Sequence, residues 1–139
     1  MDAMTASGCC TSPPLQQIHA QDFGDGRRVI FGVGMAGRGH WSASFTLVPE
    51  LESWIVELAC RSPVAPTWLG NTYQADDRWV ANDNQGGLQR LCGGKRLELQ
   101  PIAPSSRVEM DAGTIRVLPQ QILPGAATTQ WAFRLRVLD

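Results

Sequence analysis

Two stretches of the chain carry a large or small apolar residue at every second position, and this alternation constrains the fold more than any other feature. In His40–Val48 every second residue is apolar, namely Trp41, Ala43, Phe45 and Leu47. In Thr129–Leu138 the apolar residues at every second position are Trp131, Phe133, Leu135 and Val137. Successive side chains of a strand point to opposite faces, so each stretch predicts a half-buried strand. No segment carries the three- and four-residue apolar spacing of an amphipathic helix.

Shorter β-prone stretches, separated by turn signals, follow one another along the chain. They are Val29–Val33, Trp54–Arg61, Trp68–Gln74, Arg78–Ala81, Arg96–Ile102, Arg107–Met110 and Thr114–Leu118. In Trp54–Arg61 we expect Trp54, Val56, Leu58 and Cys60 to face inward. Asp111–Gly113 predicts a three-residue bulged hairpin loop between the last two of these stretches. We therefore predict an all-β antiparallel β-sandwich, or alternatively a partly open β-barrel, of about 7–9 strands. It would form a single β domain over residues 21–139, after a flexible N-terminal segment of residues 1–20.

Composition excludes several classes of protein. The chain has 139 residues, of which 43% are hydrophobic and 18% charged, and its formal net charge is −1. It lacks the strong basic charge of a typical nucleic-acid-binding domain, and no run approaches the ~20 apolar residues of a membrane span. Residues 1–10 have neither the basic nor the apolar region of a signal peptide, so a cytoplasmic location is the default expectation. Four cysteines without a CxxC pair and only two histidines lead us to expect no metal site and no cofactor.

A glycine-rich stretch, Gly32–Gly37, matches the GxGxxG pattern of dinucleotide-binding loops. That site needs a helix directly after the glycines, because the helix N-terminus holds the pyrophosphate. Here the next segment is His40–Val48, which alternates as a strand. We therefore predict a hairpin or a long loop at these glycines, and no nucleotide site.

The candidate binding residues gather between positions 68 and 87. They are Trp68, Tyr73, Trp79, Asn82, Asp83 and Asn84. Aromatic rings stack on the apolar faces of sugar rings, and neighbouring amides and carboxylates bind the hydroxyls. The run Asn82–Gly87 also resembles the amide-rich loop of starch-binding β-sandwich modules, but here Val80 and Ala81 separate the tryptophan from the amides. The alternative interpretation is that the tryptophans belong to the core and the amides to ordinary turns.

Three hypotheses about function follow. The favoured one is a non-catalytic binding or protein-interaction module, because the sequence shows no recognisable set of reactive residues. Its partner would be an unknown protein or a small polar ligand, and neither nucleic acid nor a membrane. The first alternative is a carbohydrate-binding module that uses residues 68–87. The second is a small hydrolase-type enzyme centred on His40, which shares a strand face with Ser42, although the chain has no GxSxG nucleophile motif.

Overall fold

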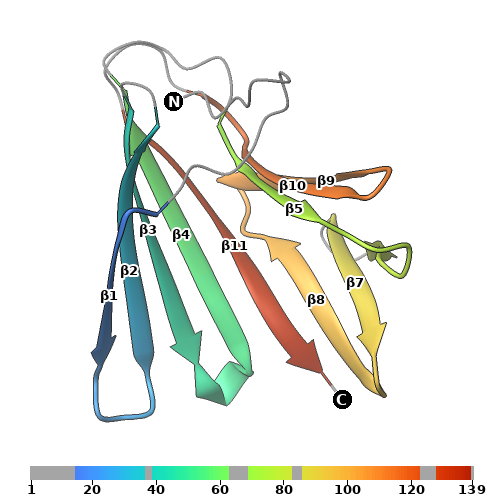
Figure 1. The fold of residues 1–139 in the computed structure, drawn as a ribbon. Helices are drawn as coiled ribbons and strands as arrows, with labels where there is room; N and C mark the ends of the chain where they lie inside the picture. Colours follow the sequence, from blue (N-terminus) through green and yellow to red (C-terminus); the bar gives the residue numbers. More distant parts are fainter. Residues whose placement is uncertain (1–14, 37–38, 63–68, 83–85, 123–127, 139) are drawn as a thin grey trace.

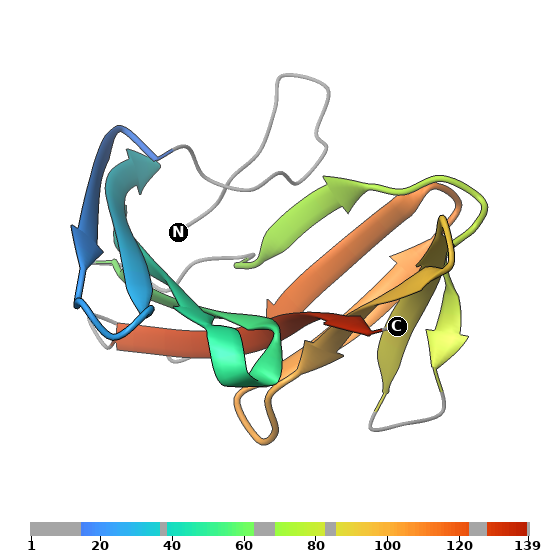
Figure 2. The same cartoon turned by 90° about the horizontal axis from the view of Figure 1, so that it is seen from below.

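The computed structural model describes residues 15–36, 39–62, 69–82, 86–122 and 128–138. These residues form two antiparallel sheets and no α-helix (Figure 1). The large sheet has the strand order β1-β2-β3-β4-β11-β8-β7-β6, and the small sheet has the order β5-β10-β9. Figure 2 shows that the large sheet is curved and that the small sheet lies over part of its concave side. The prediction of an all-β antiparallel sandwich is confirmed, and the sheets do not close into a barrel.

The strand bounds are as follows. The large sheet comprises β1 (Gln17–Asp22), β2 (Arg28–Ala36), β3 (Gly39–Val48), β4 (Ser53–Arg61), β6 (Val80–Asn82), β7 (Gly87–Cys92), β8 (Lys95–Pro101) and β11 (Thr128–Leu138). The small sheet comprises β5 (Asn71–Gln74), β9 (Ser106–Asp111) and β10 (Thr114–Pro119). A single 3-10 turn, Pro49–Leu51, joins β3 to β4. Residues 17–20, which the sequence placed in the flexible N-terminal segment, belong to β1, and residues 1–14 lie outside the described part.

The predicted strand faces agree with the register of the large sheet. Ala43 of β3 lies opposite Leu58 of β4, which in turn lies opposite Trp131 of β11. The next row of the same face contains Phe45, Val56 and Phe133. We call this side, which the small sheet covers in part, the inner face, and the opposite side the outer face. The core therefore forms where the apolar alternation of three adjacent strands comes into register.

The glycine-rich stretch forms part of a strand. β2 continues through Gly32 and Gly34, which pair with Ala43 and Trp41 of β3. β2 and β3 form the hairpin that the sequence predicted as one of two possibilities, but Gly32 and Gly34 lie within its first strand and not in a loop. A Cβ atom at Gly32 would lie 2.7 Å from a methyl carbon of Leu15, so the missing side chain leaves room for Leu15 against the sheet.

The hairpin between β9 and β10 is tighter than predicted. Asp111 pairs directly with Thr114, which leaves a loop of two residues, Ala112 and Gly113. Both have positive φ angles, 24° and 83°, as a type I′ turn requires. The sequence predicted a three-residue loop because Asp111 was counted as a loop residue, whereas it is the last residue of β9.

Candidate functional site

An apolar hollow of about 550 Å³ lies on the inner face of the large sheet, and two residues of β5 line it. Strand β5 is an edge strand of the small sheet. Buried residues that line the hollow are Val56, Leu99, Ile115 and Phe133. The more accessible residues of its lining are Ile30, Phe45, Trp54, Tyr73, Gln74, Trp79, Leu97 and Leu135. We call this cavity the inner hollow. Its volume and mainly apolar lining are typical of small-molecule binding sites.

Four side chains of the inner hollow carry polar groups: Trp54, Tyr73, Gln74 and Trp79. Within the described part of the chain, none of these side chains makes a hydrogen bond. The buried Trp131 differs, because its indole Nε1 donates to Asn71 Oδ1 at 2.9 Å. The inner hollow thus combines aromatic surface with donors and acceptors that no described protein group occupies.

Tyr73 extends from β5 toward the floor of the inner hollow. Its ring meets that of Phe133 edge to face, with 6.3 Å between the ring centroids and 67° between the planes. Tyr73 is 40% exposed, yet burial raises the pKa of its phenol to about 12. The neutral phenol is favoured because the phenolate would lose hydration among apolar side chains.

We predict a late titration of Tyr73, which is the only tyrosine of the chain. Ultraviolet difference absorption should give a midpoint above 10, toward about 12 in the folded protein, and near 10 in the unfolded protein. A raised folded-state pKa means that stability is fully present below pH 10 and is lost as the pH rises toward 12. A folded-state midpoint at or below 10 would contradict this environment of Tyr73.

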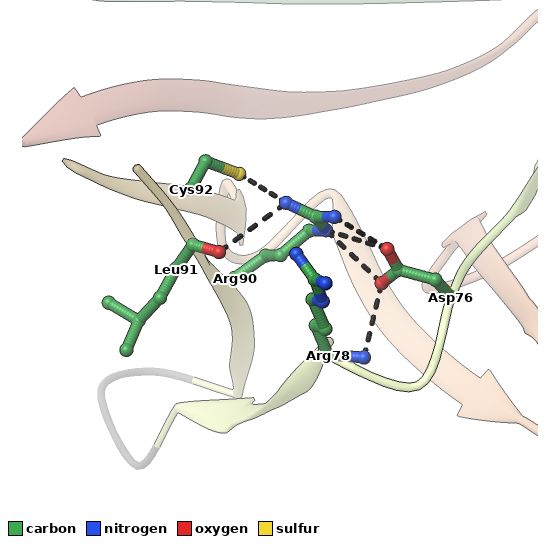
Figure 3. Close-up of polar contacts among 5 residues, drawn as sticks. All are labelled: Asp76, Arg78, Arg90, Leu91 and Cys92. Carbon is green, nitrogen blue, oxygen red and sulfur yellow. Dashed lines mark hydrogen bonds and ion pairs between the residues drawn. The ribbon is translucent and has the colours of Figure 1, made fainter. Parts of the chain in front are cut away.

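An ion pair joins Arg90 of β7 to Asp76, which lies in the segment between β5 and β6 (Figure 3). Arg90 Nε donates to both carboxylate oxygens of Asp76 at 3.1 Å, and Nη2 donates to Oδ2 at 2.6 Å. Arg90 Nη1 donates to the Leu91 carbonyl at 3.4 Å and to the Cys92 sulfur. Each nitrogen of the guanidinium therefore has an acceptor within the protein. We call the pair of Asp76 and Arg90 the clamp.

The clamp holds the segment that connects β5 to β6. This segment begins directly after Gln74 and ends with Trp79, and both residues line the inner hollow. The backbone N–H of Arg78 donates to Asp76 Oδ1 at 3.1 Å, which closes a turn inside the segment. The hydrogen bonds from Arg90 hold the pKa of the Asp76 carboxyl below its usual value, and the Arg90 pKa is raised in return. The clamp thereby ties the segment that precedes Trp79 to β7 of the large sheet.

The structure brings two of the predicted site residues together. Tyr73 and Trp79 both line the inner hollow. Asn82 lies on the outer face, where its amide Nδ2 donates to Glu98 Oε2 at 2.7 Å. The other three predicted residues lie outside the described part and are Trp68, Asp83 and Asn84. The sequence did not single out Trp54 or Gln74 as site residues. The inward position of Trp54 in its strand indicated only a core residue, and no pattern distinguished Gln74.

His40 lies exposed on the outer face of β3, opposite Met35 and Arg61 in the register. It shares a shallow depression with Ser42, but no hydrogen bond joins its ring to Ser42 or to an acid in the described ranges. Among these residues, no group of three or more His, Cys, Asp or Glu could hold a metal ion. The hydrolase hypothesis requires a base in hydrogen-bond contact, and the described residues provide none.

Comparisons with known proteins show a likeness of fold. Neither a protein-family model nor a curated protein sequence matches the chain. Two crystal structures of the heparan sulfate lyase HepC from Pedobacter heparinus, one of them a mutant, match 94% of this chain with a TM-score of 0.70 and 12% sequence identity. The chain spans 24% of the lyase chain. The similarity at this level of identity concerns the fold alone.

A crystal structure of a putative aldose 1-epimerase from Escherichia coli K12 also matches. The match has a TM-score of 0.48 and 9% identity over 98% of this chain and 78% of the epimerase.

Among the described residues, no helix has the length and apolar character needed to span a bilayer.

Proposed function

We propose that this chain is a non-catalytic carbohydrate-binding module and that the inner hollow takes a sugar ring. The observation that carries the proposal is the set of aromatic side chains around the hollow whose polar groups have no described protein partner. The resemblance of the fold to a quarter of a heparan sulfate lyase supports a carbohydrate-related role. Fold likeness alone does not assign function, so the proposal depends on the chemistry of the hollow.

The chemistry of the inner hollow suits a sugar ring. A pyranose has apolar C–H patches on its faces and hydroxyls around its edge. The rings of Tyr73, Trp79 and Trp54 supply aromatic surface, and the phenol, the indole N–H groups and the Gln74 amide can bind hydroxyls. A few polar groups within a mainly apolar lining are what fixes the orientation of a small ligand.

Isothermal titration calorimetry with a panel of soluble oligosaccharides tests the proposal. We expect the protein to bind at least one member, and Tyr73→Ala to weaken that binding about tenfold or more. A nucleic-acid base stacked on an aromatic side chain contributes about 1–3 kcal/mol, and we expect a sugar face packed on Tyr73 to contribute a similar amount. Phe31→Ala is the matched control, because Phe31 is 41% exposed, close to the 40% of Tyr73, but lies on the outer face. Absence of heat with every sugar, or equal losses in both variants, would refute the proposal.

A second candidate is association with another copy of the chain through the outer face of β2. Phe31, Val33 and Met35 form an apolar ridge there, with exposed fractions of 41%, 46% and 45%. Exposed apolar patches of this kind often mark protein contacts. If the ridge is an interface, sedimentation velocity should show a dimer that Val33→Lys dissociates. A monomer over the whole concentration range would remove this candidate.

A further inference from the structure

We infer that the inner hollow selects uncharged sugar rings and excludes those that carry a carboxylate or a sulfate. This inference rests on the proposed function and names its ligand class. The observation behind it is that all twelve described residues that line the hollow are uncharged, and only Gln74 among them has a fully polar side chain. A ligand anion would therefore meet no cation within this described lining.

Four arginines neighbour lining residues within their strands but point to the opposite face of the sheet: Arg96, Arg116, Arg134 and Arg136. Arg28 lies on the inner face two residues before Ile30 and pairs with Asp22 at 3.6 Å.

Two other cations near the hollow in the sequence are Arg78, next to Trp79, and Arg90 of the clamp. The guanidinium of Arg90 is occupied by Asp76, the Leu91 carbonyl and the Cys92 sulfur. To bind Arg90, an incoming carboxylate would have to displace the carboxylate of Asp76. Arg90 would then exchange its hydrogen bonds to Asp76 for hydrogen bonds of the same kind to the ligand, so the exchange brings no gain. The formal charges of Asp76, Asp77, Arg78 and Arg90 sum to zero, so the segment offers no net attraction to an anion.

Arg78 is exposed and lies beside Asp76 and Arg90 in Figure 3. Its positive charge contributes to lowering the pKa of Asp76, which places the charge close to that carboxylate. Arg78 is absent from the lining of the hollow. A carboxylate inside the hollow would thus exchange its hydration for apolar contacts without a paired cation, and burial of an unpaired charge is strongly unfavourable.

An uncharged ring avoids that penalty. A pyranose whose hydroxyls are all equatorial presents C–H groups on both faces, which can pack between Tyr73 on one side and the wall formed by Trp54 and Leu135. Its edge hydroxyls are neutral, so they lose less hydration free energy than a carboxylate and can be compensated by the Gln74 amide and the indole N–H groups. The lining therefore favours neutral glucose- or xylose-type rings.

The experiment compares two probes that differ in the C6 group of the sugar, a neutral hydroxymethyl in one and a carboxylate in the other. A β-linked glucose disaccharide and its counterpart with glucuronate in place of both glucoses are titrated into the full chain, into Tyr73→Ala and into Arg78→Gln, at low ionic strength and neutral pH. We expect the neutral probe to bind with a loss of about tenfold or more in Tyr73→Ala and little change in Arg78→Gln. The acidic probe should bind at least about tenfold more weakly than the neutral one.

The outcomes separate the two claims. If the glucuronate probe binds as tightly as the neutral one and Tyr73→Ala abolishes both, the hollow is a sugar site but the inference of selectivity is overturned. If acidic binding survives Tyr73→Ala and falls in Arg78→Gln or with added salt, the anion binds outside the hollow, as the inference requires. If neither this pair nor the wider panel of sugars binds, the proposed function fails, and the inference fails with it.

Discussion

Trp131→Ala is expected to lower the free energy of unfolding by about 3–5 kcal/mol, the usual cost of removing a large aromatic side chain from a core. Trp131 is 1% exposed and lies in the row with Leu58 in the middle of the large sheet. Its indole also donates to Asn71 of β5, so the substitution removes core volume and a link between the two sheets. Domains of this size are stable by about 5–15 kcal/mol, so the loss would be a large part of the total. Urea unfolding followed by circular dichroism measures it.

Two further variants separate packing from hydrogen bonding. Val137→Ala removes an apolar side chain from the same strand and the same face, but Val137 is 40% exposed and the change should stay within about 1 kcal/mol. Trp131→Phe keeps part of the ring and leaves the oxygen of the buried Asn71 without its donor, which should cost about 1–3 kcal/mol. Similar losses for Val137→Ala and Trp131→Ala would contradict the assignment of Trp131 to the central core.

The arrangement of the core was predictable because it depends on local alternation. An apolar residue at every second position specifies which face of a strand is buried, whichever strand lies beside it. The faces predicted for His40–Val48, Trp54–Arg61 and Thr129–Leu138 therefore coincide in one core once β3, β4 and β11 pair. The pairing itself joins residues far apart in the sequence, and no local pattern indicates which strands become neighbours.

The strands missed by the sequence analysis lack that alternation. All six residues of β1 are exposed, so no apolar face distinguishes it from a loop. In β7, Leu88 is buried but Leu91 is 66% exposed, so the apolar residues fall on both faces. Both strands are held by backbone hydrogen bonds to β2 and to β8, which depend on tertiary structure and not on side-chain pattern.

The candidate site was predictable in part. The aromatic residues Tyr73 and Trp79 were singled out by composition, and the structure places both at the inner hollow. Trp79 and Asn82 are separated by three positions, an odd number, which in an extended segment puts them on opposite faces. This spacing was a signal in the sequence that Asn82 would not join the tryptophan. The role of Trp54 could not be found this way, because it depends on how much of the large sheet the small sheet covers.

Arg90→Met is expected to release the segment that carries Trp79. The methionine keeps an aliphatic stem of similar length but cannot hold Asp76, so the clamp is lost while packing near β7 is largely retained. Trypsin cleaves after Arg78, and cleavage requires local opening of the segment. We expect the rate of cleavage at Arg78 to rise about tenfold. Ordering the backbone of one residue changes the equilibrium between the closed and the open segment by about that factor. Mass spectrometry of timed digests measures it, and binding of a neutral sugar should weaken in parallel.

A control variant and the pH dependence test whether the effect comes from the pair of Asp76 and Arg90. Arg107→Met removes another exposed arginine, which pairs with Glu109 at 3.2 Å on β9, and should leave cleavage at Arg78 unchanged. Because Arg90 holds the pKa of Asp76 below 3.8, the clamp is complete above that pH and is lost only as the pH falls through the lower folded-state pKa. The amide protection factors of residues 75–79, which correct for the pH dependence of intrinsic exchange, should therefore fall below about pH 4, and this loss should be absent in Asp76→Asn. If Arg90→Met and Arg107→Met are cleaved equally fast, the pair at Asp76 does not position Trp79.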